Sequence, residues 1–388
     1  MTSVAPHGKA ASRLRELPDL LFESDRFAAA CEALRAGSPA TFDNVWGSSV
    51  AAVVAAIRKR VDRPLLIIAP TAEAMDDLAD DFATFSDERI ERFPPGLDDD
   101  GASRARDEAY GTRIRLLKCW LRGDAARVVV TCPHALLQKV PEATELLGSS
   151  RVLRTGDKLD VDSFRRWLVE NGYQAMTAVE LPGEFSVRGG IVDLFAHDWP
   201  RPVRIELFDD EIESLRQFDV ATQRTVASVD SIELTVLSTA RSGDAHVAAA
   251  LPPDTCAIWL EPTRIEEQAA HLASLVEIPG VRHDWADVRR SLAPLPVATI
   301  AALAAGSLGV ECRLPIESLE RFDGDLDALR ATLDRVAGEF DVRVVTRTEG
   351  EIERVAEILQ ATRVAATGRL ALSVGCIHAG FRLLSHRV

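Results

Sequence analysis

A short stretch rich in glycine and serine follows a predicted strand and precedes a predicted helix; it consists of Gly47, Ser48, Ser49, Val50 and Ala51. Nucleotide-binding folds place the loop that holds phosphates at this point. A working loop needs a lysine against the β and γ phosphates and a serine or threonine on magnesium, but Val50 and Ala51 fill those places. Lys59 lies about nine residues further on, roughly 13 Å along a helix. We therefore do not expect this loop to support ATP hydrolysis.

A nucleotide-hydrolysing fold also needs an acidic motif, in which an apolar run ends in Asp-Glu. The aspartate holds magnesium and the glutamate orients the attacking water. The candidate run ends in Leu260 and Glu261, so a leucine stands where the aspartate should be. The two losses are independent and both indicate an inactive site. Taken alone, either loss is equally consistent with a fold that never bound nucleotide.

A second group of residues suits protein binding and lies in two predicted strands between residues 183 and 225. Alternation along the later strand puts Arg204, Glu206 and Phe208 on one face, and alternation along the earlier strand adds Arg188. Arginine and aromatic side chains dominate interface energetics, whereas an isolated exposed phenylalanine contributes little to folding. We therefore predict a protein-binding patch of Arg188, Arg204 and Phe208.

The same face also has a purely structural interpretation. In it, Phe208 packs under the loop around Trp199. The arginines then pair with Asp209, Asp210 or Glu211 as surface salt bridges, which contribute about 0 to 1 kcal/mol each. Spacing alone favours this second interpretation slightly.

Metal and redox chemistry receive little support from the sequence. The six cysteines are scattered singly, without a CxxC pair, and the eight histidines show no HExxH spacing. The cysteines are best explained as reduced packing residues. The acidic run Asp98-Asp99-Asp100 lies among prolines and glycines and is typical of a solvated loop. We predict no metal site and no cofactor in this chain.

The pattern of strands and helices sets the expected architecture. From about residue 40 they alternate, which indicates parallel strands in a doubly wound sheet. After residue 141, one helix and short alternating strands with Gly-Gly and Asp-Asp turns predict an α+β insertion. We expect an α/β fold in which residues 1–140 and 229–325 form one domain, 141–228 an insertion, and 326–388 a small α/β unit. The abrupt ending suggests a truncated product.

Composition limits the partners. The net charge of −15 disfavours an extended phosphate-binding surface, so little direct DNA binding is expected. No apolar run approaches the roughly 20 residues needed to cross a bilayer, and the N-terminus lacks the apolar core of a secretory signal. We expect no membrane contact and a cytoplasmic location.

Three segments resemble the family of transcription-repair coupling factors: GEFSVRGGIVDLF from residue 183, RIELFDDEIESLRQFDVATQRT from residue 204 and RVVVTCPHALLQKVP from residue 127. Weaker similarity covers most of residues 25–388. The N-terminal third of that family is similar to UvrB, the damage-recognition component of the excinuclease. The resemblance implies that the insertion is an interaction domain that binds the excinuclease component UvrA. The positions that match this contact are Arg188, Arg204 and Phe208.

The resemblance also implies a helicase-like domain of P-loop type without a working ATP site, so loss of an ancestral site becomes the better explanation. The family's polymerase-binding module and its two motor lobes, which use ATP and magnesium, are not found in this sequence. The long DNA-clamping hairpin of UvrB is also not matched, since only FPPGLDDDGAS stands there. We therefore expect an N-terminal fragment that recruits UvrA in transcription-coupled nucleotide-excision repair and does not contact RNA polymerase. The alternative is an active ATP-dependent helicase or translocase, or a UvrB-like protein.

In the full-length family the surface for UvrA is masked by the C-terminal end. A chain without that end should expose the surface permanently and compete with UvrB for UvrA.

Overall fold

The structure, a computed structural model, describes residues 7–96, 108–124, 127–148, 150–235, 243–275, 283–304, 306, 309–319 and 326–388. Its central element is a seven-stranded sheet with the strand order β15-β1-β14-β13-β2-β4-β3, in which every neighbouring pair is parallel. Among the described residues, no helix is both long and apolar enough to span a membrane. The acidic run 98–100 lies outside these residues.

Two separate stretches of chain build this sheet. The first contains α1 (His7–Leu20), α2 (Asp25–Arg35), β1 (Ala40–Asp43), α3 (Ser49–Arg60), β2 (Leu65–Ile68), α4 (Ala72–Phe85), β3 (Glu91–Arg92), α5 (Glu108–Arg122), β4 (Val128–Thr131), α6 (Pro133–Leu137) and α7 (Ala143–Gly148). The second contains β13 (Cys256–Leu260), α9 (Pro262–Ser274), α10 (Trp285–Leu292), β14 (Val297–Ala301) and β15 (Val310–Arg313). β13 and β14 lie between β1 and β2, so the sheet is complete only when both stretches are in place.

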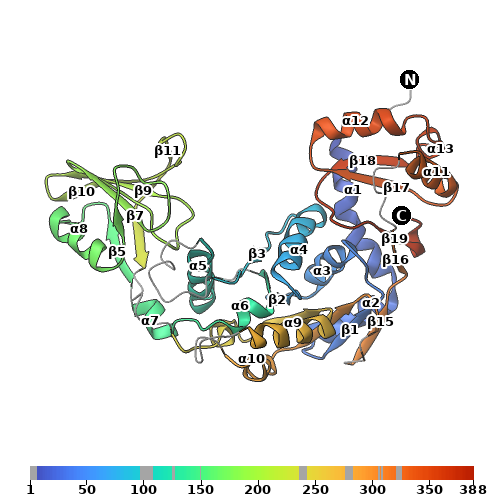
Figure 1. The fold of residues 1–388 in the computed structure, drawn as a ribbon, viewed down its shortest axis with the longest axis horizontal. Coiled ribbons are helices and arrows are strands. Elements are labelled where there is room, and N and C mark those ends of the chain that lie inside the picture. Colours follow the sequence, from blue (N-terminus) through green and yellow to red (C-terminus); the bar gives the residue numbers. More distant parts are fainter. Residues whose placement is uncertain are drawn as a thin grey trace.

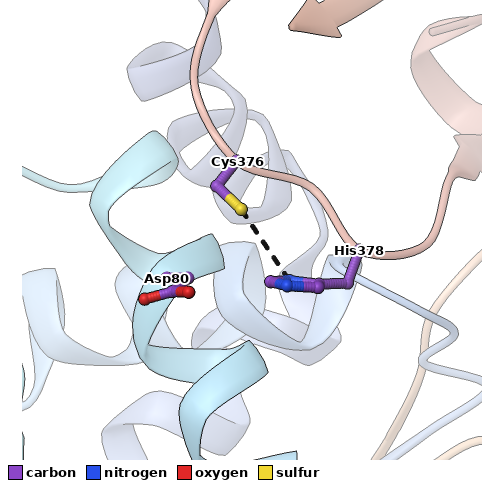
Figure 2. Close-up of side chains that lie close together, drawn as sticks. All are labelled: Asp80, Cys376 and His378. Atoms are coloured by element: carbon purple, nitrogen blue, oxygen red, sulfur yellow. Dashed lines mark hydrogen bonds between the residues drawn. The ribbon is translucent and has the colours of Figure 1, made fainter. Parts of the chain in front are cut away.

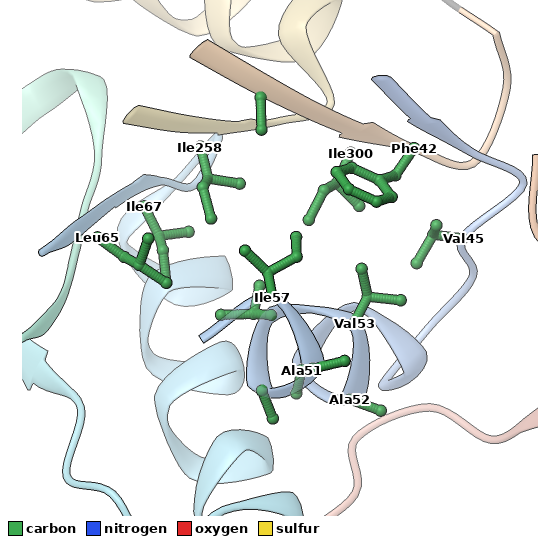
Figure 3. Packing of buried hydrophobic residues seen from close by; sticks show 14 of the residues in the cluster. Phe42, Val45, Ala51, Ala52, Val53, Ile57, Leu65, Ile67, Ile258 and Ile300 are labelled. Carbon is green, nitrogen blue, oxygen red and sulfur yellow. The ribbon is translucent and has the colours of Figure 1, made fainter. Parts of the chain in front are cut away.

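Helices cover both faces of the sheet because its strands are apolar on both sides. On one face, Leu65 and Ile67 of β2 pack with α2, α3 and α4, including Val53 and Ile57 of α3 (Figure 3). On the other face, Leu66 and Ile68 pack with α5, α6, α9 and α10. Continuous apolar strands of this kind are typical of parallel sheets. The doubly wound parallel sheet is therefore present.

The residues between the two stretches form an antiparallel unit. It contains β5 (Ser150–Arg154), α8 (Val161–Glu170), β6 (Gln174–Ala175), β7 (Glu184–Arg188), β8 (Ile191–Leu194), β9 (Val203–Phe208), β10 (Glu211–Phe218), β11 (Thr225–Val229) and β12 (Ser231–Thr235). A six-stranded sheet has the order β11-β10-β9-β8-β7-β6, and β5 pairs with β12 as a separate ribbon. Phe164 and Leu168 of α8 pack on one face with Phe185 and Ile205. The opposite face is covered in part by a smaller cluster of Val179, Phe195 and Phe218.

A small α/β unit follows β16 (Ile316–Ser318) and contains α11 (Leu326–Val336), β17 (Val342–Thr346), α12 (Glu349–Leu359), α13 (Arg363–Ala366) and β18 (Leu370–Val374). β17 and β18 pair in parallel. The chain then returns to the parallel-sheet domain, where β19 (Phe381–Leu383) pairs with β16. In Figure 1 the antiparallel unit and the small unit lie at opposite ends, with the parallel sheet between them.

A buried polar network joins α5 to the antiparallel unit. Lys118 contacts Asp198 at 2.9 Å and Thr235, and all three side chains are buried. Arg122 forms a two-pronged ion pair with Glu233 beside them. Gly111 of α5 lies so close to the carbonyl of His197 that any Cβ would collide with it. The antiparallel unit is thus fixed to the parallel-sheet domain by specific contacts.

The mixed α/β fold expected from the sequence is confirmed, with one large parallel sheet and separate antiparallel sheets. Four of the six cysteines are buried, and Cys119 and Cys376 are partly exposed.

Candidate protein interface

One face of the six-stranded sheet carries all three residues of the predicted patch. Residues paired across antiparallel strands point to the same side. One row across β7 to β10 consists of Ser186, Asp193, Arg204 and Arg216. The next row consists of Arg188, Ile191, Glu206 and Ser214. Phe208 lies two residues beyond Glu206 on β9, so it points to the same side. The structure therefore brings the patch together on one face, and its role in binding stays a prediction.

Phe208 has no packing role in this fold. Its exposed fraction is 76%, the highest among the large hydrophobic side chains of the described residues. It ends β9 just before a tight turn, in which Asp209 adopts a left-handed conformation with φ of 60°. Trp199 instead packs into the core, and its indole N–H donates to the carbonyl of Glu233 at 2.8 Å. The interpretation in which Phe208 packs under the loop around Trp199 is wrong.

Arg204 is held in place by a neighbouring strand. Its Nε and one terminal nitrogen donate to the two carboxylate oxygens of Asp193, at 2.7 and 2.8 Å. This hydrogen bond raises the pKa of the Arg204 guanidinium, although partial burial acts against it. The guanidinium also lies 5.0 Å from the ring centre of Phe218. Two-pronged pairing restricts the arginine to one orientation on the sheet.

Arg188 is more exposed and more loosely held. Its guanidinium donates to the carbonyl of Thr177 and has no carboxylate partner among the described residues. In the structural interpretation, Asp210 was a possible ion-pair partner of the arginines. It instead pairs with Lys158 at 2.8 Å. Among the described residues, Arg188 and Arg204 form no ion pair with the Asp209–Glu211 turn of the kind that the structural interpretation required.

Sequence reasoning missed two members of this face. Asp193 orients Arg204, and Ile191 is 38% exposed in the row between Arg188 and Glu206. The Gly189-Gly190 turn was the available signal, because a two-residue turn fixes the register of the hairpin and places Ile191 opposite Arg188. The face therefore combines two exposed apolar side chains, Ile191 and Phe208, with charged groups beside them.

The glycine-serine loop before α3 is closed by the chain itself. The first amides of the helix region are all satisfied: Ser48 donates to Ala379, Ser49 to Trp46, Val50 to Gly47 and Ala51 to Ser48. A helix N-terminus binds phosphate through amides that have no other partner. Ala51 is fully buried in the core. Lys59, at the other end of α3, pairs with Asp19 at 2.8 Å.

The segment after β18 lies directly over this loop. The amide of Ser48 donates to the carbonyl of Ala379 at 3.0 Å, and the amide of Ala379 donates back to the Ser48 hydroxyl at 3.1 Å. Gly47 has φ of 55°, and a Cβ there would lie 2.9 Å from the same carbonyl oxygen. The carbonyl of Ala379 thus occupies the position in front of the helix where an anion would approach.

The two residues of the acidic motif have structural partners. Leu260 is 6% exposed and belongs to the core. Glu261 adopts a left-handed conformation with φ of 50°, and its carboxylate accepts from the amide of Ala302 at 2.7 Å. Glu261 therefore fixes the turn after β13 to the end of β14.

Comparison with known proteins assigns the antiparallel unit to a domain family. Residues 152–238 match the family model of the UvrB interaction domain. The chain is also similar to transcription-repair-coupling factors. It is 29% identical to that of Bacillus subtilis strain 168 over 216 residues, and 32% identical to that of Escherichia coli K12 over 204 residues. The protein of Staphylococcus aureus strain USA300 is 34% identical over 200 residues.

These alignments cover 55%, 52% and 50% of this chain, respectively. They cover only 18%, 18% and 17% of the relatives. The chain therefore matches less than a fifth of the length of these proteins. The resemblance to transcription-repair coupling factors, with a UvrB interaction domain, is confirmed.

Proposed function

We propose that this chain binds the excinuclease component UvrA through the outer face of its UvrB interaction domain, in transcription-coupled nucleotide-excision repair. The observation that carries the proposal is the 76% exposed side chain of Phe208, on the same sheet face as Arg188 and Arg204. An exposed aromatic anchor beside arginines has the composition of an interface hot spot. The names of the matched domain and of the similar proteins supply the identity of the partner.

The proposal assigns different roles to the two arginines. Arg204 is oriented by Asp193 and offers its remaining donors in a fixed direction. Arg188 is exposed and can adapt its side chain to a partner. Both are positive charges on a chain whose net charge is −15, which favours an acidic patch on UvrA as the opposing surface.

The test is the affinity of the purified chain for UvrA, measured by calorimetry or interferometry. Replacing Phe208 with Ala should weaken binding by about 2 kcal/mol or more, roughly 30-fold, because the anchor is lost. Arg188→Ala and Arg204→Ala should each weaken binding less. Val169→Ala is the matched control, since Val169 is 55% exposed on α8, which covers the opposite side of the sheet. Unchanged affinity in all three patch variants would refute this surface.

We further propose that this chain hydrolyses no ATP and that its parallel-sheet domain is a helicase-like fold with a lost nucleotide site. The support is the saturation of the amides from Ser48 to Ala51 by internal carbonyls, together with Val50 and Leu260 in the places of catalytic residues. ATP and magnesium then belong to the motor lobes of the full-length family. Micromolar affinity for ATP with turnover would support the rival function, an active translocase.

The remaining partners follow from the same proposal. RNA polymerase is expected to bind a module of the family outside the matched region, and the negative net charge disfavours direct DNA binding. A repair role of this kind places the chain in the cytoplasm.

A further inference from the structure

Three side chains with metal-binding atoms converge where the segment after β18 meets α4. They are Asp80 of α4 and Cys376 and His378 of the segment, and their ligand atoms all lie within 4.8 Å of one another. Figure 2 shows the Cys376 thiol pointing between the His378 ring and Asp80. The sulfur lies 3.9 Å from Nδ1 of His378. None of these residues belongs to the predicted partner surface.

The two ligands on the segment are held by hydrogen bonds to residues that are not ligands. The hydroxyl of Thr84 donates to the carbonyl of Cys376 and accepts from its amide, both at 2.8 Å. The carboxylate of Asp81, buried to all but 4%, accepts from the amide of His378 at 3.1 Å and contacts Nδ1 at 2.8 Å. Partners of this kind orient metal-bound histidines in many proteins. The backbone thus presents both side chains toward α4 before any ion arrives.

The local charge also favours a cation. Asp77, Asp80 and Asp81 lie on one side of α4. Asp81 holds Nδ1 of His378, and Nε2 lies 3.2 Å from Asp77, a contact that an ion bound to Nε2 would replace. Arg347 lies near Cys376 and is the opposing positive charge. Asp80 and Cys376 line a surface pocket, which gives an ion a path to the site.

We propose that Asp80, Cys376 and His378 bind a zinc ion that clasps the segment after β18 onto α4. A thiolate, an imidazole and a carboxylate together suit Zn²⁺ better than magnesium or calcium, which prefer oxygen ligands. Tetrahedral zinc needs bond lengths of about 2.0 to 2.3 Å, so the three side chains must close slightly around the ion. Zinc binds the thiolate and the neutral imidazole, so its entry releases their protons.

The position of this site gives the ion a structural consequence. Ala379, which closes the glycine-serine loop, is the next residue after His378, and β19 begins two residues later. A zinc ion bound to His378 would therefore hold Ala379 over the loop and help to position β19 against β16. Because the zinc site does not involve the partner face, the failure of one proposal leaves the other standing.

The experiment titrates Zn²⁺, and Co²⁺ as a spectroscopic probe, into the complete chain after treatment with a chelator. We expect one equivalent of zinc, a thiolate-to-cobalt charge-transfer band in the near ultraviolet, and a higher midpoint of thermal unfolding with zinc. Cys376→Ser should abolish the band, and Asp80→Asn should weaken zinc binding at least tenfold. Cys119→Ser is the matched control, because Cys119 is the other partly exposed cysteine and should keep all three signals.

Two results would overturn the proposal. One is the absence of a stoichiometric zinc equivalent in the unaltered chain. The other is a cobalt band that persists in Cys376→Ser and disappears in Cys119→Ser. Circular dichroism of each variant before metal addition establishes that the fold is intact. His378→Gln, which keeps a polar side chain next to Asp81, provides a second ligand variant should Cys376→Ser fail to fold.

Discussion

Two regions of this chain have sequences suited to binding, but the structure treats them in opposite ways. On the outer face of the interaction domain, Phe208 is exposed and Arg188 has only a backbone carbonyl as partner among the described residues. At the loop before α3, the amides from Ser48 to Ala51 all donate to carbonyls of the same chain. A binding surface needs groups that are not already satisfied by contacts within the chain. A sequence motif therefore indicates where a site could be, whereas the internal contacts of its groups decide whether a ligand can reach them.

The two regions also differ in the sequence separation of the contacts that shape them. The outer face of the six-stranded sheet is formed by strands that are close in sequence, so its exposure is determined locally. The loop is closed by Ala379, whose amide reaches Ser48 across 331 positions of sequence. A change in the segment after β18 can therefore affect the loop without any change near it. The face should be insensitive to the same change.

The largest effect is expected from a substitution that disrupts the contact between the loop before α3 and Ala379. Gly47→Ala should lower the free energy of unfolding by about 2 kcal/mol or more, because a Cβ at φ of 55° is strained and meets the Ala379 carbonyl at 2.9 Å. Chemical denaturation measures this loss. The affinity for UvrA should not change, since the interaction domain lies at the other end of the parallel sheet (Figure 1).

Gly123→Ala separates the collision from the backbone strain. Gly123 has φ of 76°, and a Cβ there would meet nothing within 4 Å. This control should therefore cost only the strain of the left-handed conformation, about 1 kcal/mol. Equal losses in the two variants would mean that Ala379 does not press on the loop.

A smaller effect is expected at the contact between α5 and the antiparallel unit, which links the face to the domain that contains the loop. Arg122 bonds to Glu233 and lowers the pKa of that carboxyl from 4.5 to about 2, although partial burial opposes the shift. A lowered pKa stabilises the fold above the unfolded value of 4.5, and this stabilisation is lost as the pH falls from 4.5 toward 2. Arg122 is 38% exposed, so solvent screening limits the contribution to about 1 kcal/mol.

The measurement is the unfolding midpoint of the unaltered chain and of Glu233→Gln between about pH 7 and pH 3. Near neutral pH the variant should be less stable by about 1 kcal/mol, and the difference should shrink below pH 4.5. Glu213→Gln is the control, because Glu213 is exposed and has no ion pair among those found in the described part of the chain. A pH-independent difference would assign the effect to packing rather than to charge.

Much of this architecture follows from local patterns. Alternating apolar strands and helices predict the parallel sheet, and Gly189-Gly190 and Asp209-Asp210 mark the turns of the two central hairpins. Alternation also places Arg188, Arg204 and Phe208 on one face, because side chains in a strand alternate regardless of the rest of the fold. These features depend on residues within a few positions of each other.

Two features that the sequence did not reveal depend on more than the local pattern. The pairing of Asp193 with Arg204, 11 positions apart, requires the register of β8 and β9. The approach of Cys376 and His378 to Asp80 requires the segment after β18 to return to α4, which lies far earlier in the chain. The bond from His378 to Asp81 has a sequence separation of 297. Cys376 and His378 are two positions apart, but this spacing is neither CxxC nor HExxH, and no local pattern places Asp80 beside them.

The smallest expected effect concerns the stability of the open face. Phe208→Ala should change the free energy of unfolding by no more than about 0.5 kcal/mol, because a side chain that is 76% exposed loses little packing when it is truncated. Phe218 offers the matched comparison on the same sheet. It is 1% exposed, so Phe218→Ala should cost about 3 kcal/mol or more. Denaturation of both variants measures the contrast. A comparable loss in Phe208→Ala would show that this ring stabilises the domain itself, and the face could then no longer be regarded as open.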